Sequence, residues 1–156
     1  MSSANRTPEY VYTTDISQFI DYSVPQLEEA APIQEAIAAI GRSPGGAVLL
    51  HKPNSRQLGG IITVSDLAKL EKFGPQDWIH KQAKDLATTS GVIGIKYDAK
   101  LWELLRLING VNSRKRPLDQ VPVVDADKQI IGLIDRESLN RRMVELEYGP
   151  ASMIVS

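Results

Sequence analysis

The stretch VPVVDADKQIIGLIDRESL, residues 121–139, decides the fold. It contains two short apolar runs, Val121–Val124 and IIGLI at 130–134, with a polar loop between them. Apolar runs of this length, bounded by turn residues, are typical of buried strands. The apolar side chains that follow have helical spacing and are Leu139, Met143 and Leu146. The stretch therefore predicts a strand, a loop, a second strand and a helix.

The same order occurs once before, nearer the N-terminus. Ala47–Leu50 and GGIIT at 59–63 are again apolar runs on either side of a polar loop. A further helical pattern follows, at Leu67, Leu70 and Phe73. The glycines of the two closing strands, Gly60 and Gly132, lie 72 residues apart. The chain is therefore an internal repeat of two similar units.

An amphipathic helix precedes each pair of strands. Apolar residues recur at i, i+3, i+4 and i+7 in both copies, 68 residues apart: Ile33, Ala36, Ile37 and Ile40, then Leu101, Leu104, Leu105 and Ile108. The extended stretches SVPQL at 23–27 and GVIGI at 91–95 add a third strand in front of each helix. Asp15–Tyr22 is a candidate for a further helix, whereas residues 1–14 show no periodicity.

Composition excludes several classes of function. The chain has 156 residues and a formal charge of −1, so no global field draws it to nucleic acid or to an anionic membrane. It has no cysteine, which excludes disulfides, thiolate metal sites and a cysteine nucleophile. No apolar stretch is long enough for a signal peptide or a membrane span. We expect a cytoplasmic protein with neither nucleic acid nor membrane as a partner.

The repeat resembles a known family on the residues quoted above. LGGIITVSDL at 58–67 and VPVVDADKQIIGLIDRESL at 121–139 look like the closing halves of two CBS motifs. The resemblance implies an α/β fold of tandem β-α-β-β-α motifs that form a pseudo-twofold CBS pair, or Bateman module. We place motif one at residues 15–75 and motif two at 76–147, with an N-terminal extension at 1–14 and a C-terminal tail at 148–156.

The resemblance also implies a ligand, because CBS pairs commonly bind adenosine-containing molecules in the clefts between their motifs. Gly60 would allow close approach, Thr63 would face the phosphate or ribose, and Asp66 would accept hydrogen bonds from the ribose diol. The adenine would lie against the first strand of motif two. The other candidate ligand-binding residues are Ser65, Gly91, Val92, Ile93, Arg116, Val121 and Pro122.

Motif two departs from the pattern at two positions. Asp135 stands where the hydroxyl of Thr63 stands in motif one, and Ser138 stands where Asp66 stands. A neutral hydroxyl cannot replace a bidentate carboxylate, and Asp135 would repel a phosphate. Arg116, in the longer loop before Val121, is the candidate cation for a phosphate bound at Asp66. We therefore expect one nucleotide per chain, in the cleft of Thr63 and Asp66.

Each candidate also has a purely structural interpretation. Thr63 and Asp66 have the spacing of a capping box at a helix start, and Asp135 is an equally good N-cap. Arg116 could belong to a solvated basic loop, and residues 91–93 to an ordinary core strand. The capping and ligand-binding roles of Asp66 are compatible with each other.

Signals for catalysis are weak. His51 and His80 are isolated, so neither a metal-ligand spacing nor a nucleophile and base pair is visible. We predict no catalytic residue, no metal site and no required cofactor, with an adenine nucleotide as a regulatory ligand. The resemblance implies a disc-like homodimer that signals to an effector protein. The alternative is a ligand-free dimerisation or interaction module whose clefts are filled by its own side chains.

Overall fold

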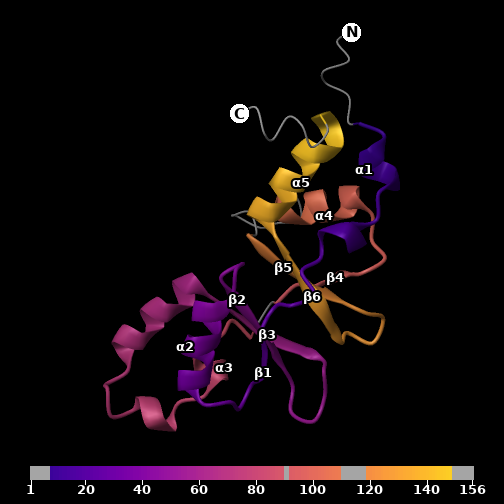
Figure 1. Cartoon of the computed structure of the whole chain (residues 1–156). Helices are drawn as coiled ribbons and strands as arrows, with labels where there is room; N and C mark the ends of the chain where they lie inside the picture. The colour runs from indigo at the N-terminus through magenta and orange to yellow at the C-terminus, as the bar shows by residue number, and fades with distance from the viewer. Residues whose placement is uncertain (1–7, 90–91, 110–118, 149–156) are drawn as a thin grey trace.

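A computed structural model describes residues 8–89, 92–109 and 119–148, and it contains two three-stranded sheets (Figure 1). The first sheet has the order β1-β2-β3 and the second has the order β4-β5-β6. In both sheets the first pair of strands is parallel and the second pair is antiparallel. The predicted repeat of a β-α-β-β-α unit is therefore confirmed. The strands are β1 (Gln26–Glu28), β2 (Ala47–His51), β3 (Leu58–Thr63), β4 (Ile95–Lys96), β5 (Gln120–Val124) and β6 (Ile130–Asp135).

The first strand of each sheet starts later than predicted. Instead of beginning at 23 and 91, β1 begins at Gln26 and β4 at Ile95. Pro25 precedes β1 and lacks an amide donor, so only its carbonyl joins the ladder, where it accepts from the Leu49 amide at 3.0 Å. Gly94 precedes β4, and a Cβ at this position would lie 3.4 Å from the Pro122 carbonyl oxygen.

The amphipathic helices form as predicted. They are α2 (Ile33–Arg42) and α4 (Leu101–Ile108), and each follows the first strand of its sheet. Their periodic apolar residues face the two cores, with Ile37 and Leu105 only partly buried at the margins. The fully or nearly fully buried members are Ile33, Ala36 and Ile40 in α2 and Leu101, Leu104 and Ile108 in α4.

The closing helices of the two motifs differ. Motif two closes with a 13-residue α-helix, α5 (Arg136–Tyr148), whereas motif one closes with a 3-10 helix, η3 (Val64–Lys72). The apolar positions explain the difference. Leu67, Leu70 and Phe73 are spaced by three residues, which matches the three residues per turn of a 3-10 helix. These side chains are only partly buried against the first core.

A short lead segment at the start of each motif packs on the core of the other motif. The 3-10 helix η2 (Ile16–Phe19) lies at the start of motif one, but Ile16 and Phe19 lie in the core that also contains α4, β5 and α5 residues. The helix α3 (Ala83–Leu86) precedes β4, but its Ala83 and Leu86 lie in the core of α2, β2 and β3. Each motif therefore completes the hydrophobic core of its partner.

The N-terminal segment is more structured than its lack of periodicity indicated. Residues Tyr10–Thr13 form a short helix, α1, whose Val11 is 4% exposed in the core of motif two. Figure 1 shows this indigo helix beside α4 rather than beside its sequence neighbours β1 and α2. Asp15–Tyr22 does not form one helix, because only η2 is helical there. The connector around Trp78 is ordered and includes the 3-10 helix η4 (Trp78–His80).

The two sheets meet at their hairpins. The Leu58 amide donates to the Lys128 carbonyl at 3.0 Å, and the Ile130 amide donates to the Arg56 carbonyl at 2.9 Å. Beneath these contacts lies a third apolar cluster drawn from both motifs, with Val24, Ala47, Leu49, Ile130 and Leu133 as its buried members. These contacts hold the starts of β3 and β6 together at the boundary between the motifs.

Candidate functional site

The site in motif one begins where β3 ends. Thr63 is the last residue of β3, and its amide donates to Asp66 Oδ2 at 2.8 Å. The Thr63 hydroxyl lies 3.3 Å from the same oxygen and 2.9 Å from the hydroxyl of Ser65. This is the predicted capping box at the start of η3, and it is confirmed. The capping contacts hold the Asp66 carboxylate in one position at the end of the strand.

The second oxygen of Asp66 has a partner that the sequence analysis missed. Lys69 Nζ lies 3.1 Å from Asp66 Oδ1, and it also donates to the backbone carbonyl of Leu86 at 2.9 Å. The Asp66 side chain is 12% exposed and that of Lys69 is 38% exposed. Both oxygens of the candidate ribose acceptor therefore already have donors in the protein.

The lead segment of motif two crosses β3 beside these residues. Thr88 and Ile61 exchange two backbone hydrogen bonds, of 3.0 and 3.1 Å. A Cβ at Gly60 would lie 3.1 Å from the Thr88 carbonyl oxygen, so the glycine at this position allows the two backbones to pack closely. Gly60 therefore has a structural role in joining the motifs, beside the predicted approach of a ligand.

A cleft of about 360 Å³ lies between the two motifs, at the start of both closing helices. Thr63 and Asp135, which occupy equivalent positions in the two motifs, line this one cleft. The Gln120 side chain crosses the boundary and donates to the Gly45 carbonyl at 3.2 Å. The lining residues are Pro44, Gly45, Gly46, Thr63, Val64, Ser65, Asp119, Gln120, Asp135 and Glu137.

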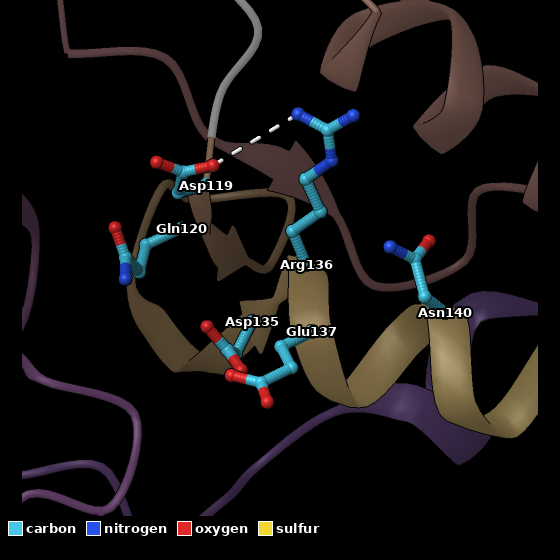
Figure 2. A pocket seen from close by; sticks show the side chains of 6 residues that line it. All are labelled: Asp119, Gln120, Asp135, Arg136, Glu137 and Asn140. Carbon is cyan, nitrogen blue, oxygen red and sulfur yellow. Dashed lines mark ion pairs between the residues drawn. The ribbon is translucent and has the colours of Figure 1, made fainter.

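A second cleft, of about 490 Å³, continues along the start of α5 (Figure 2). The Arg136 side chain reaches toward Asp119, with 3.9 Å between Nη1 and Oδ1, and the Arg136 amide donates to the Asp119 carbonyl at 2.8 Å. Among the described residues, the charged side chains of the two clefts are Asp119, Asp135, Glu137 and Arg136. These carboxylates outnumber the guanidinium, so this part of the surface favours neutral or cationic groups.

The equivalent position in motif two is used for capping. Asp135 Oδ2 accepts from the Ser138 amide at 3.3 Å and lies 3.4 Å from the Ser138 hydroxyl. The prediction that Asp135 is an N-cap is confirmed. Motif two therefore has its carboxylate and hydroxyl in the reverse order, and among the described residues only motif one has a hydroxyl at the end of the strand and a carboxylate three residues later.

The other predicted site residues differ in exposure, and two of them lie outside the described residues. Ile93 is 38% exposed and Val92 is partly buried, in the segment just before β4. The side chain of Val121 is fully buried in the second core, and Pro122 is also buried, so neither side chain lies on a described cleft. Gly91 and Arg116 lie outside the described residues. The ligand contacts of all these residues stay predictions.

The described ranges 8–89, 92–109 and 119–148 contain neither a cluster of metal-binding side chains nor a membrane-spanning helix. No group of three or more His, Asp or Glu residues is placed there to hold a metal ion. No helix in those ranges is long and apolar enough to cross a membrane.

Known proteins share this arrangement of strands and helices. The family model described as the CBS domain matches residues 83–145. No curated protein sequence matches the chain. The fold is similar to that of CBSX2 from Arabidopsis thaliana, solved in complex with AMP, with a TM-score of 0.68 and 20% identity over 86% of this chain and 98% of that one.

Two further solved structures have the same fold. One is the CBS domain pair of MJ0100 in complex with 5′-methylthioadenosine and S-adenosyl-L-methionine, with a TM-score of 0.66 and 21% identity over 83% of this chain and 95% of that one. The other is an uncharacterized conserved protein from Pyrococcus horikoshii, with a TM-score of 0.68 and 20% identity over 88% of this chain. This chain spans 57% of the length of that protein.

The fold is therefore a tandem pair of α/β motifs with a cleft at the boundary between them. It is the fold of a CBS pair, and residues 83–145 match the CBS domain model. The predicted resemblance is confirmed by the family model in motif two and by the fold in motif one.

Proposed function

We propose that this protein is a regulatory module that binds one adenosine-containing ligand per chain at the Thr63 and Asp66 end of the boundary between its motifs. The observation that carries this proposal is the Thr63 hydroxyl at the end of β3, beside the cleft, followed three residues later by the Asp66 carboxylate, an order that motif two reverses. A carboxylate held by its own helix start is a suitable acceptor for both hydroxyls of a ribose.

The solved relatives support adenosine as the common chemistry. CBSX2 was solved with AMP, and MJ0100 with methylthioadenosine and S-adenosylmethionine. These three molecules share adenosine and differ only in the group attached at the 5′ carbon. In our proposal the adenine lies near Val92 and Ile93, the ribose diol meets Asp66, and the 5′ group extends past Thr63 into the cleft.

The charges around the cleft affect which 5′ group the site would favour. Asp135 and Glu137 face the same cleft as Thr63, so a chain of phosphates would meet carboxylates there. Arg136 is available as a cation but is shared with Asp119. Arg116, by our prediction, supplies a further cation. A ligand panel must therefore vary the 5′ charge from positive to strongly negative.

We further propose that the ligand acts by favouring one conformation and that the output passes to a homodimer partner or an effector protein. Large apolar side chains are exposed on the helices of motif two. Trp102 of α4 is 38% exposed, and Val144 and Leu146 of α5 are each 39% exposed. These side chains fit a contact with a second molecule. In this proposal the module regulates and does not catalyse.

One observation favours the alternative of a ligand-free interaction module. Asp66 is only 12% exposed and is already paired with Thr63 and Lys69, as a carboxylate with a purely structural role would be. In that case the described clefts would serve only to hold the motifs together.

Isothermal titration calorimetry separates the two functions. The full chain is titrated with adenosine, methylthioadenosine, S-adenosylmethionine, AMP, ATP and cyclic di-AMP. We expect binding of at least one of them with one site per chain. Absence of binding by all six ligands would reject the nucleotide proposal and leave the interaction module. Native mass spectrometry of freshly purified protein would identify any ligand that co-purifies.

A further inference from the structure

Lys69 links the candidate ribose acceptor to the lead segment of motif two. It lies one turn after Asp66 on η3, and its ammonium group contacts Asp66 Oδ1 at 3.1 Å and the Leu86 carbonyl at 2.9 Å. Leu86 is the last residue of α3, and its side chain is fully buried in the core of motif one. One side chain therefore connects the site to the point where the chain enters motif two.

The hydrogen bonds of Asp66 leave little capacity for a ligand. A carboxylate accepts about four hydrogen bonds, two at each oxygen. Oδ2 accepts from the Thr63 amide and lies within hydrogen-bond distance of the Thr63 hydroxyl, and Oδ1 accepts from Lys69. A ribose diol needs two acceptor positions, but one remains. A bidentate contact with the diol therefore requires one of the present donors to leave.

Two of these donors can leave: Lys69, and the Thr63 hydroxyl, which lies 3.3 Å from Oδ2 and has Ser65 as another partner at 2.9 Å. Only the departure of Lys69 frees Oδ1 and removes the positive charge that competes for the carboxylate. The Thr63 amide is fixed by the backbone at the end of β3, whereas Lys69 is held at the end of a flexible side chain that is 38% exposed. An ammonium group released into solvent regains its hydration. The Leu86 carbonyl, by contrast, would lose the side-chain donor that Lys69 provides.

We propose that Lys69 is an internal competitor for Asp66 and that the ribose of the ligand displaces it; this inference rests on the proposed function. Displacement also breaks the contact between Lys69 and the end of α3. The segment after α3 pairs with β3 through Thr88 and packs on Gly60. Ligand binding and the attachment of this segment to motif one are thereby coupled through a single side chain.

The test uses adenosine as the probe, because it is neutral and its binding has no direct dependence on ionic strength. Lys69→Met should bind adenosine about three- to tenfold more tightly than the wild type, since each tenfold corresponds to about 1.4 kcal/mol. Lys69→Arg, which keeps the charge, should remain close to the wild type. Lys72→Met is the matched control, since Lys72 is an exposed lysine on the same helix and the ion pair of Asp66 is with Lys69, and it should change nothing.

Ionic strength gives a readout that a merely structural role would not move. Salt weakens the pair between Lys69 and Asp66, so wild-type affinity for adenosine should rise between low salt and about 0.5 M KCl. The affinity of Lys69→Met should stay constant over the same range. Lys69→Gln serves as a second uncharged variant, with thermal unfolding as the check that each variant is folded.

The outcomes separate this inference from the proposed function. Tighter, salt-independent binding by Lys69→Met and Lys69→Gln supports the competitor role. Equal or weaker binding by both variants, while the wild type binds and Asp66→Ala does not, overturns that role and leaves the ligand site intact. If neither the wild type nor any variant binds adenosine, AMP or S-adenosylmethionine, the proposed function itself fails.

Discussion

Asp66 and Ser138 occupy the same position in the two motifs, three residues after the end of the closing strand. If Asp66 accepts the ribose diol, Asp66→Ala should cost about 1.5–3 kcal/mol of binding, as expected for lost hydrogen bonds to a charged group. Ser138→Ala should change binding little. Calorimetry with the tightest ligand of the panel measures both. Equal losses from the two substitutions would contradict occupancy of a single site.

Asp66→Asn is the control that separates binding from folding. The amide keeps one oxygen, which can still accept from the Thr63 amide and cap η3. We therefore expect the asparagine variant to unfold at nearly the wild-type temperature but to bind more weakly. Asp66→Ala should lose both binding and about 0.5–2 kcal/mol of stability.

Arg116 is the residue whose predicted role depends on the phosphate. If it contacts a 5′ phosphate through a charge-assisted hydrogen bond, Arg116→Ala should weaken AMP and ATP binding severalfold and leave adenosine binding unchanged. Titrations with the three ligands measure the difference. Equal weakening of all three would reject the phosphate contact, and Lys72→Ala serves as the control for a general loss of positive charge.

At the residue scale, the candidate site was predictable where its contacts are local. Thr63 and Asp66 contact each other across three residues, and this spacing is visible as a capping box. Asp135 was predicted as an N-cap for the same reason. The contact of Lys69 with the Leu86 carbonyl spans 17 residues and depends on how α3 packs, so no local pattern indicates it.

At the scale of elements, Gly132 of β6 holds the lead segment of motif one against motif two. A Cβ there would lie 2.5 Å from the Asp21 carbonyl oxygen and 2.6 Å from Ile20 Cγ2. Because the first of these atoms belongs to the backbone, Gly132→Ala must shift the chain, and we expect a loss of about 1–3 kcal/mol of stability. Urea unfolding monitored by circular dichroism measures it.

Gly41 provides the control for this substitution. It lies in α2, and a Cβ there has no neighbour within 4 Å, so Gly41→Ala should stabilise the protein by up to about 1 kcal/mol. Gly60→Ala should fall between the two, because its Cβ would lie 3.1 Å from the Thr88 carbonyl oxygen. A Gly132→Ala variant as stable as Gly41→Ala would contradict the close packing of the two motifs.

The elements were predicted best where apolar periodicity is strong. The spacing in α2 and α4 and the apolar runs of β2 and β5 each indicate one structure, and each is present. The starts of β1 and β4 and the 3-10 geometry of η3 were predicted less well, because each depends on a few single residues. Pro25 has no amide to donate, and Leu67, Leu70 and Phe73 repeat every three residues instead of following the α-helical pattern.

At the scale of the whole molecule, the feature that the sequence conceals is the exchange of lead segments between the motifs. The repeat predicts two units that follow each other along the chain, at 15–75 and 76–147. In the structure, η2 completes the core of motif two and α3 completes the core of motif one. Periodicity shows that a helix has an apolar face but not which core that face covers. Which core each lead segment completes therefore follows only from the packing of the folded chain.

The exchange has a consequence that a single substitution can test. Ile16 lies at the start of motif one in sequence, yet it is fully buried in the core of motif two. Ile16→Ala should cost about 2–5 kcal/mol, as expected for truncating a large buried side chain. Hydrogen exchange measured by mass spectrometry should show the loss of protection first in β5 and β6, rather than in β2 and β3.

Leu86→Ala is the mirror-image variant, since Leu86 follows motif one in sequence and is fully buried in its core. Its loss of protection should begin in β2 and β3. Because the motifs share a third apolar cluster at the hairpins, both variants should also weaken the other motif, but later and less. If Ile16→Ala opened β2 and β3 first, each motif would close its own core and the exchanged arrangement would be wrong. If Ile16→Ala opens β5 and β6 first and Leu86→Ala opens β2 and β3 first, then neither motif holds its fold without the lead segment of the other.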